Sequence, residues 1–344
     1  MAGTSSSNTF PDTIRWGILG PGSIAHQFAS GVKELPDAKV VAVGSRDGAK
    51  AIAFADTFSI PNRHASYQAL VEDPEVDAIY VATPHPFHKE HCLLALNAGK
   101  PVLSEKPFTI NHAELTEIVD TARKNDLFLM EGMWSRFFPL MGRVRELLAE
   151  GAIGEVRLLE ADFGFRAGVD PNGRLFAPAL GGGALLDVGV YTVSLASMFL
   201  GSPDRITGLA TLGETGVDEQ AAMVLGYPNG ALAMLSTAIR TNTPHKATLN
   251  GTDGRITLQS PWWKLDRALV SRNGKPDEEI HLPYEGNGFN YEAAEVGRCL
   301  RAGKKESAIM PLEESLSIMA TLDTLRGQWG LKYPMEYLLN CNDT

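Results

Sequence analysis

Three side chains in two separate motifs have the types and spacing that proton transfer requires. Lys106 follows a short apolar run and stands in the motif Glu105-Lys106-Pro107. A lysine at the end of a buried strand is unusual, because lysine side chains normally lie in solvent. Asp187 and Tyr191 are four residues apart, so both project from one face of the helix that this stretch predicts. We therefore expect Lys106, Tyr191 and Asp187 to be catalytic.

A glycine-rich turn near the N-terminus predicts where a dinucleotide would bind. Residues 14–19 read as a buried strand and the residues from 23 to 35 as a helix, joined by Gly20-Pro21-Gly22-Ser23-Ile24-Ala25. Gly20 would allow the tight bend and Gly22 the approach of a pyrophosphate, while Ser23 and Ile24 begin a helix whose N–H groups face the anion. A glycine turn that binds nothing is the alternative, but its position between strand and helix favours a cofactor site.

A lysine and a tyrosine beside a dinucleotide suggest reversible hydride transfer between nicotinamide and a carbinol carbon. Tyr191 would take the hydroxyl proton, although a free tyrosine has a pKa of about 10. The charge of Lys106 would lower the pKa of Tyr191 and stabilise negative charge on the substrate oxygen. Asp187 would bind a neighbouring hydroxyl or hold Lys106; a buried tyrosine bonded to an aspartate is the structural alternative.

The end of the second predicted strand, residues 39–43, favours NADP over NAD. Ser45 and Arg46 come first past the strand, and Lys50 lies one helical turn further on. Arginine can pair with two oxygens of a 2′-phosphate, whereas an acidic residue would accept from the 2′-hydroxyl of NAD. We expect Ser45, Arg46 and Lys50 to bind the phosphate; in the alternative, Asp47 is the ribose ligand.

The third predicted strand, residues 78–82, ends at another position where open α/β sheets hold ligands. Two histidines on one loop would suit a metal, but a third ligand at a recognisable spacing is missing, so we expect no metal site. The side chains expected to pack around the cofactor are Thr83, Pro84, His85 and His88 from this loop, with Glu105 and Lys106.

Strand–helix alternation ends near Met133, which predicts two domains. We expect a flexible N-terminal arm over residues 1–13 and a Rossmann domain, a doubly wound parallel sheet, over 14–133. An α+β substrate-binding and oligomerisation domain would span 134–344, with last helices at 291–302 and 313–329 that pack back on the Rossmann domain. Trp134 and Arg136 at the junction would form a wall of the substrate pocket, and interdomain packing explains them nearly as well.

Three turn signals in the second half predict hairpins and a large, mostly antiparallel sheet. Asn229-Gly230, Asp253-Gly254 and Asn273-Gly274 each separate two runs of strand-forming residues. Such a sheet has an open face that is buried only against another layer. We therefore expect a homodimer or a tetramer formed through that face.

The composition excludes several classes of protein. The 344 residues are 44% hydrophobic and carry a net charge of −10, which argues against a nucleic-acid partner. No run approaches the roughly 18 apolar residues that a bilayer requires, and the N-terminus lacks the features of an export signal. Three scattered cysteines fit a reducing cytoplasm.

Taken together, these motifs resemble the glucose–fructose oxidoreductase/inositol dehydrogenase/MocA family from about Ile14 to Trp329. The residues that carry the resemblance are Gly20-x-Gly22-x-x-Ala25, Thr83-Pro84 with His88, Glu105-Lys106-Pro107 and the run from Gly181-Gly182-Gly183 to Asp187-x-Gly189-x-Tyr191. Within the family, Met130-Glu131-x-x-Trp134-x-Arg136-Phe137-Phe138-Pro139 is similar to the dimeric dihydrodiol dehydrogenase branch, which also oxidises D-xylose with NADP. Tyr191 stands where inositol dehydrogenases usually have histidine, so an inositol substrate is not expected.

The resemblance implies that Lys106 and Tyr191 are the catalytic pair and that Trp134 and Phe163 are substrate-pocket aromatics. It also places Arg174 near the cofactor, although the residues around it differ from the family pattern. The expected substrate is an aldose, or second a cyclic diol. The alternatives are an aldose–aldose or glucose–fructose-type oxidoreductase that keeps its NADP(H) bound and, in a different class, a regulatory protein that senses NADP without catalysis.

Overall fold

The computed structural model describes residues 10–338, and its N-terminal half is built on a six-stranded parallel sheet. The strands are ordered β3-β2-β1-β4-β5-β6, so the order reverses between β1 and β4, where such folds bind ligands. Near-continuous apolar runs form these strands because helices cover both faces. Their bounds are β1 Ile14–Leu19, β2 Ala38–Gly44, β3 Asn62–His64, β4 Ala78–Val81, β5 Val102–Glu105 and β6 Leu129–Gly132.

The first helix of this half begins at Ser23, as predicted, and side-chain caps begin several of the others. Ser66 accepts a hydrogen bond from the N–H of Ala69 at the start of α3, and Asn111 accepts from the N–H of Glu114 at the start of α5. The helices are α1 Ser23–Val32, α2 Gly48–Phe58, α3 Tyr67–Val71, α4 His88–Asn97 and α5 His112–Lys124, with a 3₁₀ turn, η1, at His85–Phe87.

The second half contains an eight-stranded sheet in the order β14-β13-β12-β11-β7-β10-β9-β8. Neighbouring strands are antiparallel except for the parallel pair β7 and β10, so the expected mostly antiparallel sheet is confirmed. All three predicted turns connect adjacent antiparallel strands. The strands are β7 Val156–Gly164, β8 Arg205–Leu212, β9 Asp218–Gly226, β10 Leu232–Ala238, β11 Ala247–Gly251, β12 Gly254–Leu258, β13 Arg267–Arg272 and β14 Glu278–His281.

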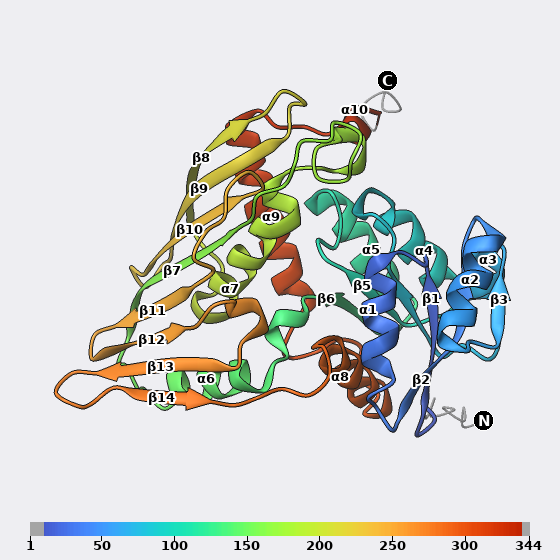
Figure 1. Cartoon of the computed structure of the whole chain (residues 1–344), viewed down its shortest axis with the longest axis horizontal. Coiled ribbons are helices and arrows are strands. Elements are labelled where there is room, and N and C mark those ends of the chain that lie inside the picture. Colours follow the sequence, from blue (N-terminus) through green and yellow to red (C-terminus); the bar gives the residue numbers. More distant parts are fainter. Residues whose placement is uncertain (1–9, 339–344) are drawn as a thin grey trace, which may run out of the picture.

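Helices occupy the space between the two sheets (Figure 1). Helix α7 packs on β7 and β10, and α9 packs on α7 and β8 on one side and on α5 and β6 on the other. Helix α8 packs on α1, so both late helices contact the N-terminal half. Their bounds are α6 Pro139–Ala149, α7 Val190–Leu200, α8 Phe289–Arg301, α9 Leu312–Trp329 and α10 Pro334–Leu338, with short turns η2 Trp134–Arg136, η3 Pro178–Leu180, η4 Leu185–Gly189 and η5 Trp262–Lys264.

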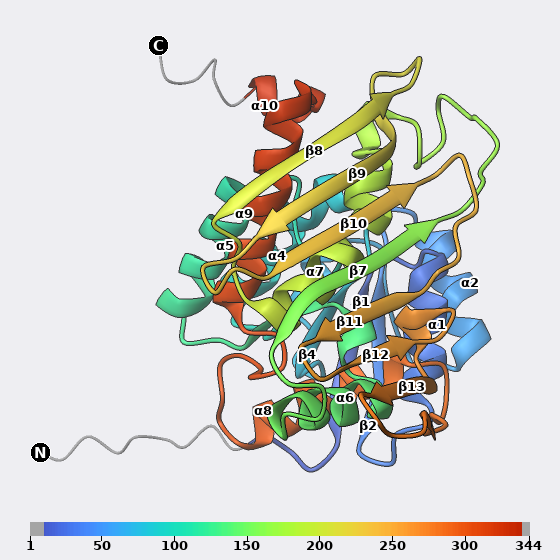
Figure 2. The ribbon, with the colours of Figure 1, turned by 90° about the vertical axis from the view of Figure 1, so that its left-hand side faces the viewer.

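The opposite face of the eight-stranded sheet carries exposed aliphatic side chains. Seen from that side, β8, β9, β10 and β7 lie in front and the helices behind them (Figure 2). Val224 pairs with Met234, and Leu209 pairs with Ala222 two positions away, so the register places their side chains on one face. The exposed fractions are 83% for Leu209 and 49% for Met234.

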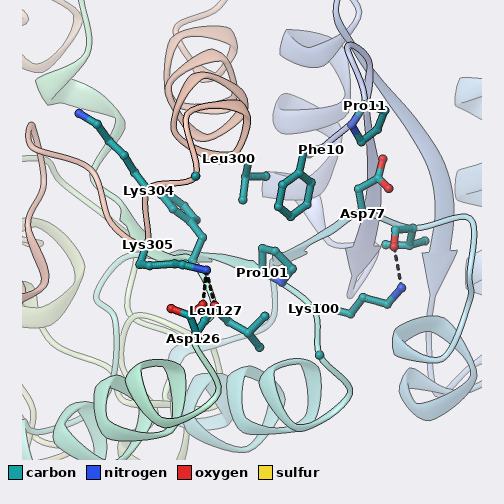
Figure 3. A pocket seen from close by; sticks show the side chains of 14 residues that line it. Phe10, Pro11, Asp77, Lys100, Pro101, Asp126, Leu127, Leu300, Lys304 and Lys305 are labelled. Carbon is teal, nitrogen blue, oxygen red and sulfur yellow. Dashed lines mark hydrogen bonds and ion pairs between the residues drawn. The ribbon is translucent and has the colours of Figure 1, made fainter. Parts of the chain in front are cut away.

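Most of the predicted flexible arm, residues 1–9, lies outside the described residues. Phe10, by contrast, packs against the core. Its ring lies beside Pro101 and Leu300 at the wall of a cavity of about 300 Å³ (Figure 3). This cavity is at the amino ends of β4, β5 and β6, remote from the carboxyl ends where the predicted residues gather.

The segment Pro178–Leu200 corrects one expectation from the sequence. It is 23 residues long and apolar enough to meet the length and composition of a membrane-spanning helix, so such a stretch does exist in the chain. However, 83% of its most apolar window is buried inside the protein, with α7 packed between the eight-stranded sheet and α9. Its hydrophobicity is therefore that of a core helix.

Candidate active site

A cavity of about 290 Å³ at the carboxyl ends of the parallel strands brings together most of the predicted site residues. Three strand ends contribute to it, and the eight-stranded half closes it through two side chains. The lining residues are Gly22, Ser23, Ile24, Ala82, Thr83, Pro84, His85, His88, Glu105, Lys106, Arg174 and Asp187. The cavity beside Phe10 is similar in size but is lined by none of the predicted residues, so the candidate site is the cavity at the carboxyl ends.

The glycine loop has the geometry that a pyrophosphate requires. Gly20 has a φ of +96°, and a Cβ there would lie 2.8 Å from Thr83 Cγ2. A Cβ on Gly22 would meet only the carbonyl oxygen of Ala82, at 3.8 Å, so space remains beside the loop. Helix α1 has neither a side-chain cap nor an acidic residue in its first turn. Its N-terminal N–H groups are thus available to an anion.

At the end of β2, Asp47 and Arg46 have different surroundings. The Asp47 carboxylate accepts from the N–H groups of Ala49 and Lys50, which caps α2. Arg46 is exposed, and its guanidinium lies 5.7 Å from the centre of the Phe87 ring. Capping of α2 already engages Asp47. The arrangement therefore favours Arg46 as the group that would face the adenosine ribose of the cofactor. The exposed Lys50 and the buried Ser45 lie beside Arg46.

The two loop histidines hold backbone on opposite sides of the cavity. His85 Nε2 lies 2.7 Å from the carbonyl oxygen of Gly181, which joins the two halves of the chain. Burial lowers the pKa of His85 to about 3, so it is a neutral donor. His88 is also buried, with Nε2 at 2.6 Å from Thr83 O and Nδ1 at 3.0 Å from Pro107 O. Both ring nitrogens of His88 face carbonyls, so it shapes the wall rather than binding through a free nitrogen.

Lys106 lies where the two halves of the molecule meet. Its Nζ donates to the backbone carbonyl of Asp187 at 2.7 Å and lies 3.8 Å from the Asp187 carboxylate. The same Nζ is 4.7 Å from the centre of the Tyr191 ring. Burial lowers the pKa of Lys106, against the opposing effect of the Asp187 and Glu105 charges. The structure thus brings together the three residues expected to be catalytic.

Asp187 pairs with a second cation at the cavity edge. Arg174 Nη1 is 2.6 Å from Asp187 Oδ1, while the Arg174 side chain remains half exposed. Burial alone would raise the pKa of Asp187, but the charges of Lys106 and Arg174 outweigh it and lower that pKa. Asp187 is therefore an ionised anchor for both cations, which is the holding role that the sequence left open for it.

The pKa of Tyr191 shifts upward, opposite to the lowering that the sequence predicted. Its hydroxyl oxygen accepts from Trp134 Nε1 at 2.7 Å, and aspartate is not its partner. Burial raises the pKa of Tyr191 well above 10, and the charges of Glu105 and Asp187 add to this effect, so Lys106 does not bring it down. A tyrosine in these surroundings keeps its proton at neutral pH and can donate it.

Aromatic rings enclose the far side of Tyr191. The centre of the Phe163 ring lies 5.3 Å from that of Tyr191, and Phe163 stacks on Trp263 with 3.5 Å between ring centres. Trp134 stacks on Phe289 with 5.0 Å between ring centres. Trp134 and Phe163 thus lie beside the predicted catalytic tyrosine. Trp263 and Phe289 escaped sequence reasoning because they come from η5 and α8, distant in the chain and without a motif of their own.

The triple glycine leaves room for two side chains that approach its backbone closely. A Cβ on Gly181, where φ is +67°, would lie 2.2 Å from His85 Nε2. A Cβ on Gly183, where φ is +125°, would lie 2.2 Å from Asp218 Oδ1. The other oxygen of Asp218 accepts from Leu185 N at 2.6 Å, at the start of the single π-helical turn η4. Asp218, unnoticed in the sequence, thereby fixes the turn that carries Asp187.

The position of Arg136 corrects the expectation that this residue forms a wall of the substrate pocket, because its guanidinium is buried among protein groups away from the cavity. The side chain is 1% exposed and donates from Nε to Ser194 Oγ, from Nη1 to Ile309 O and from Nη2 to Ser194 O and Glu314. The carboxylate of Glu314 lies 2.7 Å away. With its donors engaged in this way, Arg136 ties the start of the second half to α7 and α9 instead of binding substrate.

Metal ligation has no support from the geometry. Within residues 10–338, no group of three or more His, Cys, Asp or Glu is placed to hold a metal ion. His85 and His88, the pair that raised the question, each bond to backbone carbonyls.

Fold and site together define an oxidoreductase with a dinucleotide-binding domain, and comparison with known proteins agrees. The oxidoreductase family with an NAD-binding Rossmann fold, GFO/IDH/MocA, matches residues 14–133, and the GFO/IDH/MocA C-terminal domain matches residues 141–257. The chain belongs to the GFO/IDH/MocA family.

Two named relatives are similar to this chain over nearly its full length. Trans-1,2-dihydrobenzene-1,2-diol dehydrogenase of Mus musculus is 40% identical over 335 residues, which cover 94% of this chain and 99% of that protein. The Homo sapiens protein of the same name is 38% identical, with the same shares covered.

Solved structures show the same architecture. The 3-ketoreductase KijD10 from Actinomadura kijaniata, in complex with NADP and TDP-benzene, has a TM-score of 0.80 and 29% identity, covering 92% of this chain and 97% of its own. The aldose-aldose oxidoreductase from Caulobacter crescentus has a TM-score of 0.83 at 24% identity, covering 91% and 96%, and shows the shared fold alone.

Proposed function

We propose that this protein is an NADP-dependent dehydrogenase that transfers a hydride between nicotinamide and a CH–OH carbon of a sugar or a cyclic diol. The observation that carries this proposal is the meeting of Lys106, Asp187 and Tyr191, the first two of which line the glycine-loop cavity. The names of the dihydrodiol dehydrogenase relatives and of the NADP-bound ketoreductase support it.

The residues present suit the cofactor. The uncapped start of α1 and the space beside Gly22 would hold the pyrophosphate, and the exposed Arg46, with Ser45 and Lys50, would hold the 2′-phosphate. Thr83, Pro84, His85, His88, Glu105 and Arg174 would form the remaining walls. Bound nicotinamide supplies the hydride acceptor or donor.

The protein's part is to orient the substrate and to manage one proton. Trp134 donates to the Tyr191 oxygen, which leaves the Tyr191 O–H to donate to the substrate oxygen. In the reduction direction, Tyr191 gives this proton to the oxygen as the carbonyl becomes an alcohol. In the oxidation direction the same path runs in reverse: the O–H bond of the alcohol breaks, Tyr191 takes that proton, and the proton that Tyr191 carried passes to the neutral amine of Lys106, whose pKa burial lowers. In reduction Lys106 gives this proton back to Tyr191.

The aromatic enclosure indicates the substrate class. Phe163, Trp134 and the two rings stacked on them present apolar faces beside Tyr191, while Lys106 and Asp187 supply the polar rim. Such a site suits a ring with hydroxyl groups on its edge, because the ring faces stack while the hydroxyls form hydrogen bonds. An aldose oxidised at its anomeric carbon is the first candidate, and an aromatic trans-dihydrodiol the second.

We also propose an oligomeric state and a cellular compartment for this protein. The aliphatic face formed by Leu209, Val224, Leu232 and Met234 would pair with the same face of a second copy, giving a homodimer or a tetramer. The cysteines within residues 10–338, Cys92 and Cys299, are buried thiols, which suits a reducing cytoplasm.

The test is turnover by the purified protein on a panel of aldoses and a trans-dihydrodiol, with NADP or NAD, followed by the absorbance of the reduced nicotinamide. Multiple turnovers that scale with added NADP are expected. One turnover of nucleotide that copurifies, without exchange, would indicate an oxidoreductase that needs a second sugar. Nucleotide binding without turnover on any substrate would contradict the proposal and favour a sensor.

A further inference from the structure

Lys264, the last residue of η5, brings a cation to the edge of the aromatic enclosure, and the chemistry described above does not use it. Its Nζ lies 5.5 Å from the centre of the Trp134 ring, where η5 packs on η2. The Lys264 side chain is otherwise exposed. An exposed cation–π pair contributes little to stability, so the position of Lys264 is better explained by what its ammonium can bind.

Two aromatic contacts connect η5 to the proposed proton donor, Tyr191. Trp134, under the ammonium of Lys264, donates from Nε1 to the Tyr191 hydroxyl oxygen at 2.7 Å. Trp263, the residue before Lys264, stacks on Phe163, and Phe163 contacts the Tyr191 ring. A substrate ring held at Tyr191 would therefore have η5 and its cation at its far edge.

The backbone of η5 is held in place, which gives Lys264 a defined position. Trp262 is fully buried, and it donates from Nε1 to Asp162 O at 2.8 Å and from its backbone N–H to His245 O at 3.2 Å. The backbone N–H of Lys264 donates to Pro261 O at 2.9 Å. A side chain on a supported turn of this kind discriminates between ligands because its base does not have to be ordered on binding.

Within residues 10–338, no carboxylate lies at ion-pair distance from Lys264 Nζ, and no protein oxygen accepts a hydrogen bond from it. The cations at the glycine-loop cavity differ in this respect. Lys106 lies 3.8 Å and Arg174 lies 2.6 Å from the carboxylate of Asp187. A positive charge and three N–H donors thus remain at Lys264 for a ligand.

We propose that Lys264 is a specificity-determining residue that binds an anionic group of the substrate, so that the preferred substrate is a sugar with a carboxylate or a phosphate away from its reacting carbon. This inference deepens the proposed function and rests on it. An ammonium forms charge-assisted hydrogen bonds with either anion, and these are stronger than its bonds to a neutral hydroxyl. The reacting carbon would face Tyr191 and Lys106, and the anion would face Lys264.

The direct test is the equilibrium binding of three sugars that differ only at carbon 6: glucose, glucuronate and glucose 6-phosphate. Each is titrated by calorimetry into protein saturated with NADPH, which cannot accept a hydride from the sugar and also fills the phosphate sites of the cofactor. At least one of the two anionic sugars should bind about tenfold more tightly than glucose, and the tighter one identifies the anion.

The outcomes separate this inference from the proposed function. Equal affinity for the three sugars, with turnover of glucose, would overturn the role of Lys264 and leave the proposed function in place. Binding of none of the three would overturn the inference and would also count against a sugar substrate.

Variants assign the preference to one side chain. In Lys264→Met, which removes the charge, the ratio of the dissociation constants for glucose and the favoured anionic sugar should fall from about ten to about one. Lys264→Arg, which keeps the charge, should retain the preference. The matched control is Lys275→Met, at an exposed lysine between β13 and β14, and its ratio should equal that of wild type. A preference that survives in Lys264→Met would overturn the proposal.

The kinetic test distinguishes anion binding from a structural role. Lys264→Met should raise KM for the favoured anionic sugar about tenfold and change its kcat by less than about threefold, because the remote anion is bound equally in the ground state and the transition state. Displacement of Trp134 would instead lower kcat for glucose and for the anionic sugar alike, and that result would overturn the proposal. Added KCl should weaken the preference in wild type, since salt screens exposed charges; a preference that is independent of salt would contradict the ionic contact.

Discussion

The two sheets of this protein contribute to the site in different ways. The parallel sheet presents its groups at strand ends: the glycine loop follows β1, Arg46 follows β2, His85 lies just past β4 and Lys106 follows β5. The eight-stranded sheet presents an aromatic ring, Phe163, near the end of β7. It carries Tyr191 and Asp187 on a helix that lies across its covered face, positioned by Asp218 of β9.

The difference shows that the chemistry depends on the junction. Lys106 has its carboxylate partner and its aromatic neighbour in the second half of the chain, and Tyr191 has its indole donor, Trp134, at the junction between the two halves. The outer face of the eight-stranded sheet carries aliphatic side chains instead, which suits association. The predictions below test separately the strand ends of the parallel sheet, the helix on the covered face of the eight-stranded sheet, and the outer face of that sheet.

The largest effect is expected at the tyrosine that the second sheet carries. Tyr191→Phe should lower kcat by about 10²- to 10⁴-fold, because it removes the proton donor and keeps the ring. Tyr227→Phe is the matched control, since Tyr227 is also buried in this half and its hydroxyl has no hydrogen-bond partner. Steady-state kinetics of both variants decide the point; wild-type turnover in Tyr191→Phe would contradict the assignment.

Asp218 should make stability depend on pH. Burial raises its pKa to about 7, from an ordinary value of 3.8, so the folded protein binds this proton more tightly than the unfolded chain. The contribution of Asp218 therefore falls as pH rises from about 4 through 7, by roughly 2–4 kcal/mol in all. Asp218→Asn should lose this dependence, and its stability relative to wild type should rise across that window in urea unfolding experiments.

The control for that measurement is Asp253→Asn, at an exposed hairpin turn of the same sheet. It should unfold with the same pH dependence as wild type. Parallel curves for Asp218→Asn and wild type would mean that the buried carboxyl is solvated or compensated in a way this account omits.

Arg46 tests the contribution of the parallel sheet. Arg46→Ala should raise KM for NADP by about 10- to 100-fold and leave KM for NAD nearly unchanged, because it removes charged hydrogen bonds to a phosphate that NAD lacks. Arg63→Ala, which removes an exposed arginine paired with Asp56, is the control for a general charge effect. Equal losses with both cofactors would place the 2′-phosphate elsewhere.

The smallest effect on catalysis is expected at the outer face. Leu209→Glu should weaken self-association by about tenfold or more while leaving kcat close to wild type, because it places a charge where the apolar face would be buried. Ile52→Glu alters an exposed aliphatic residue on α2 and serves as the control. Light scattering over a dilution series measures the self-association of both variants. If Leu209→Glu assembles like wild type, the interface is on another surface.

Sequence reasoning succeeded where the function is local in the chain. The glycine loop, the Glu105-Lys106-Pro107 motif and the hairpin turns each contain their own physical explanation within a few residues. Asp187 and Tyr191 were found because helical spacing places them together, and their closeness to Lys106 was expected from the proposed proton transfer and from the family resemblance, not from any spacing in the chain.

The rest could not be predicted because it depends on burial and on distant partners. Arg136 resembles a pocket residue in the sequence, but its carboxylate partner, Glu314, is 178 residues away. The pKa of Tyr191 rises because of desolvation that no motif reports.

The central claim, that the two halves form one proton-handling unit, is tested most directly by a double-mutant cycle in kcat. The variants are Lys106→Met, Tyr191→Phe and the two combined, each measured with NADP and the best substrate of the panel. Residues that act as a unit are strongly non-additive, so the double variant should be no slower than the slower single variant by more than a few-fold. Losses that multiply in the double variant would mean that Lys106 and Tyr191 act independently, which would contradict the account.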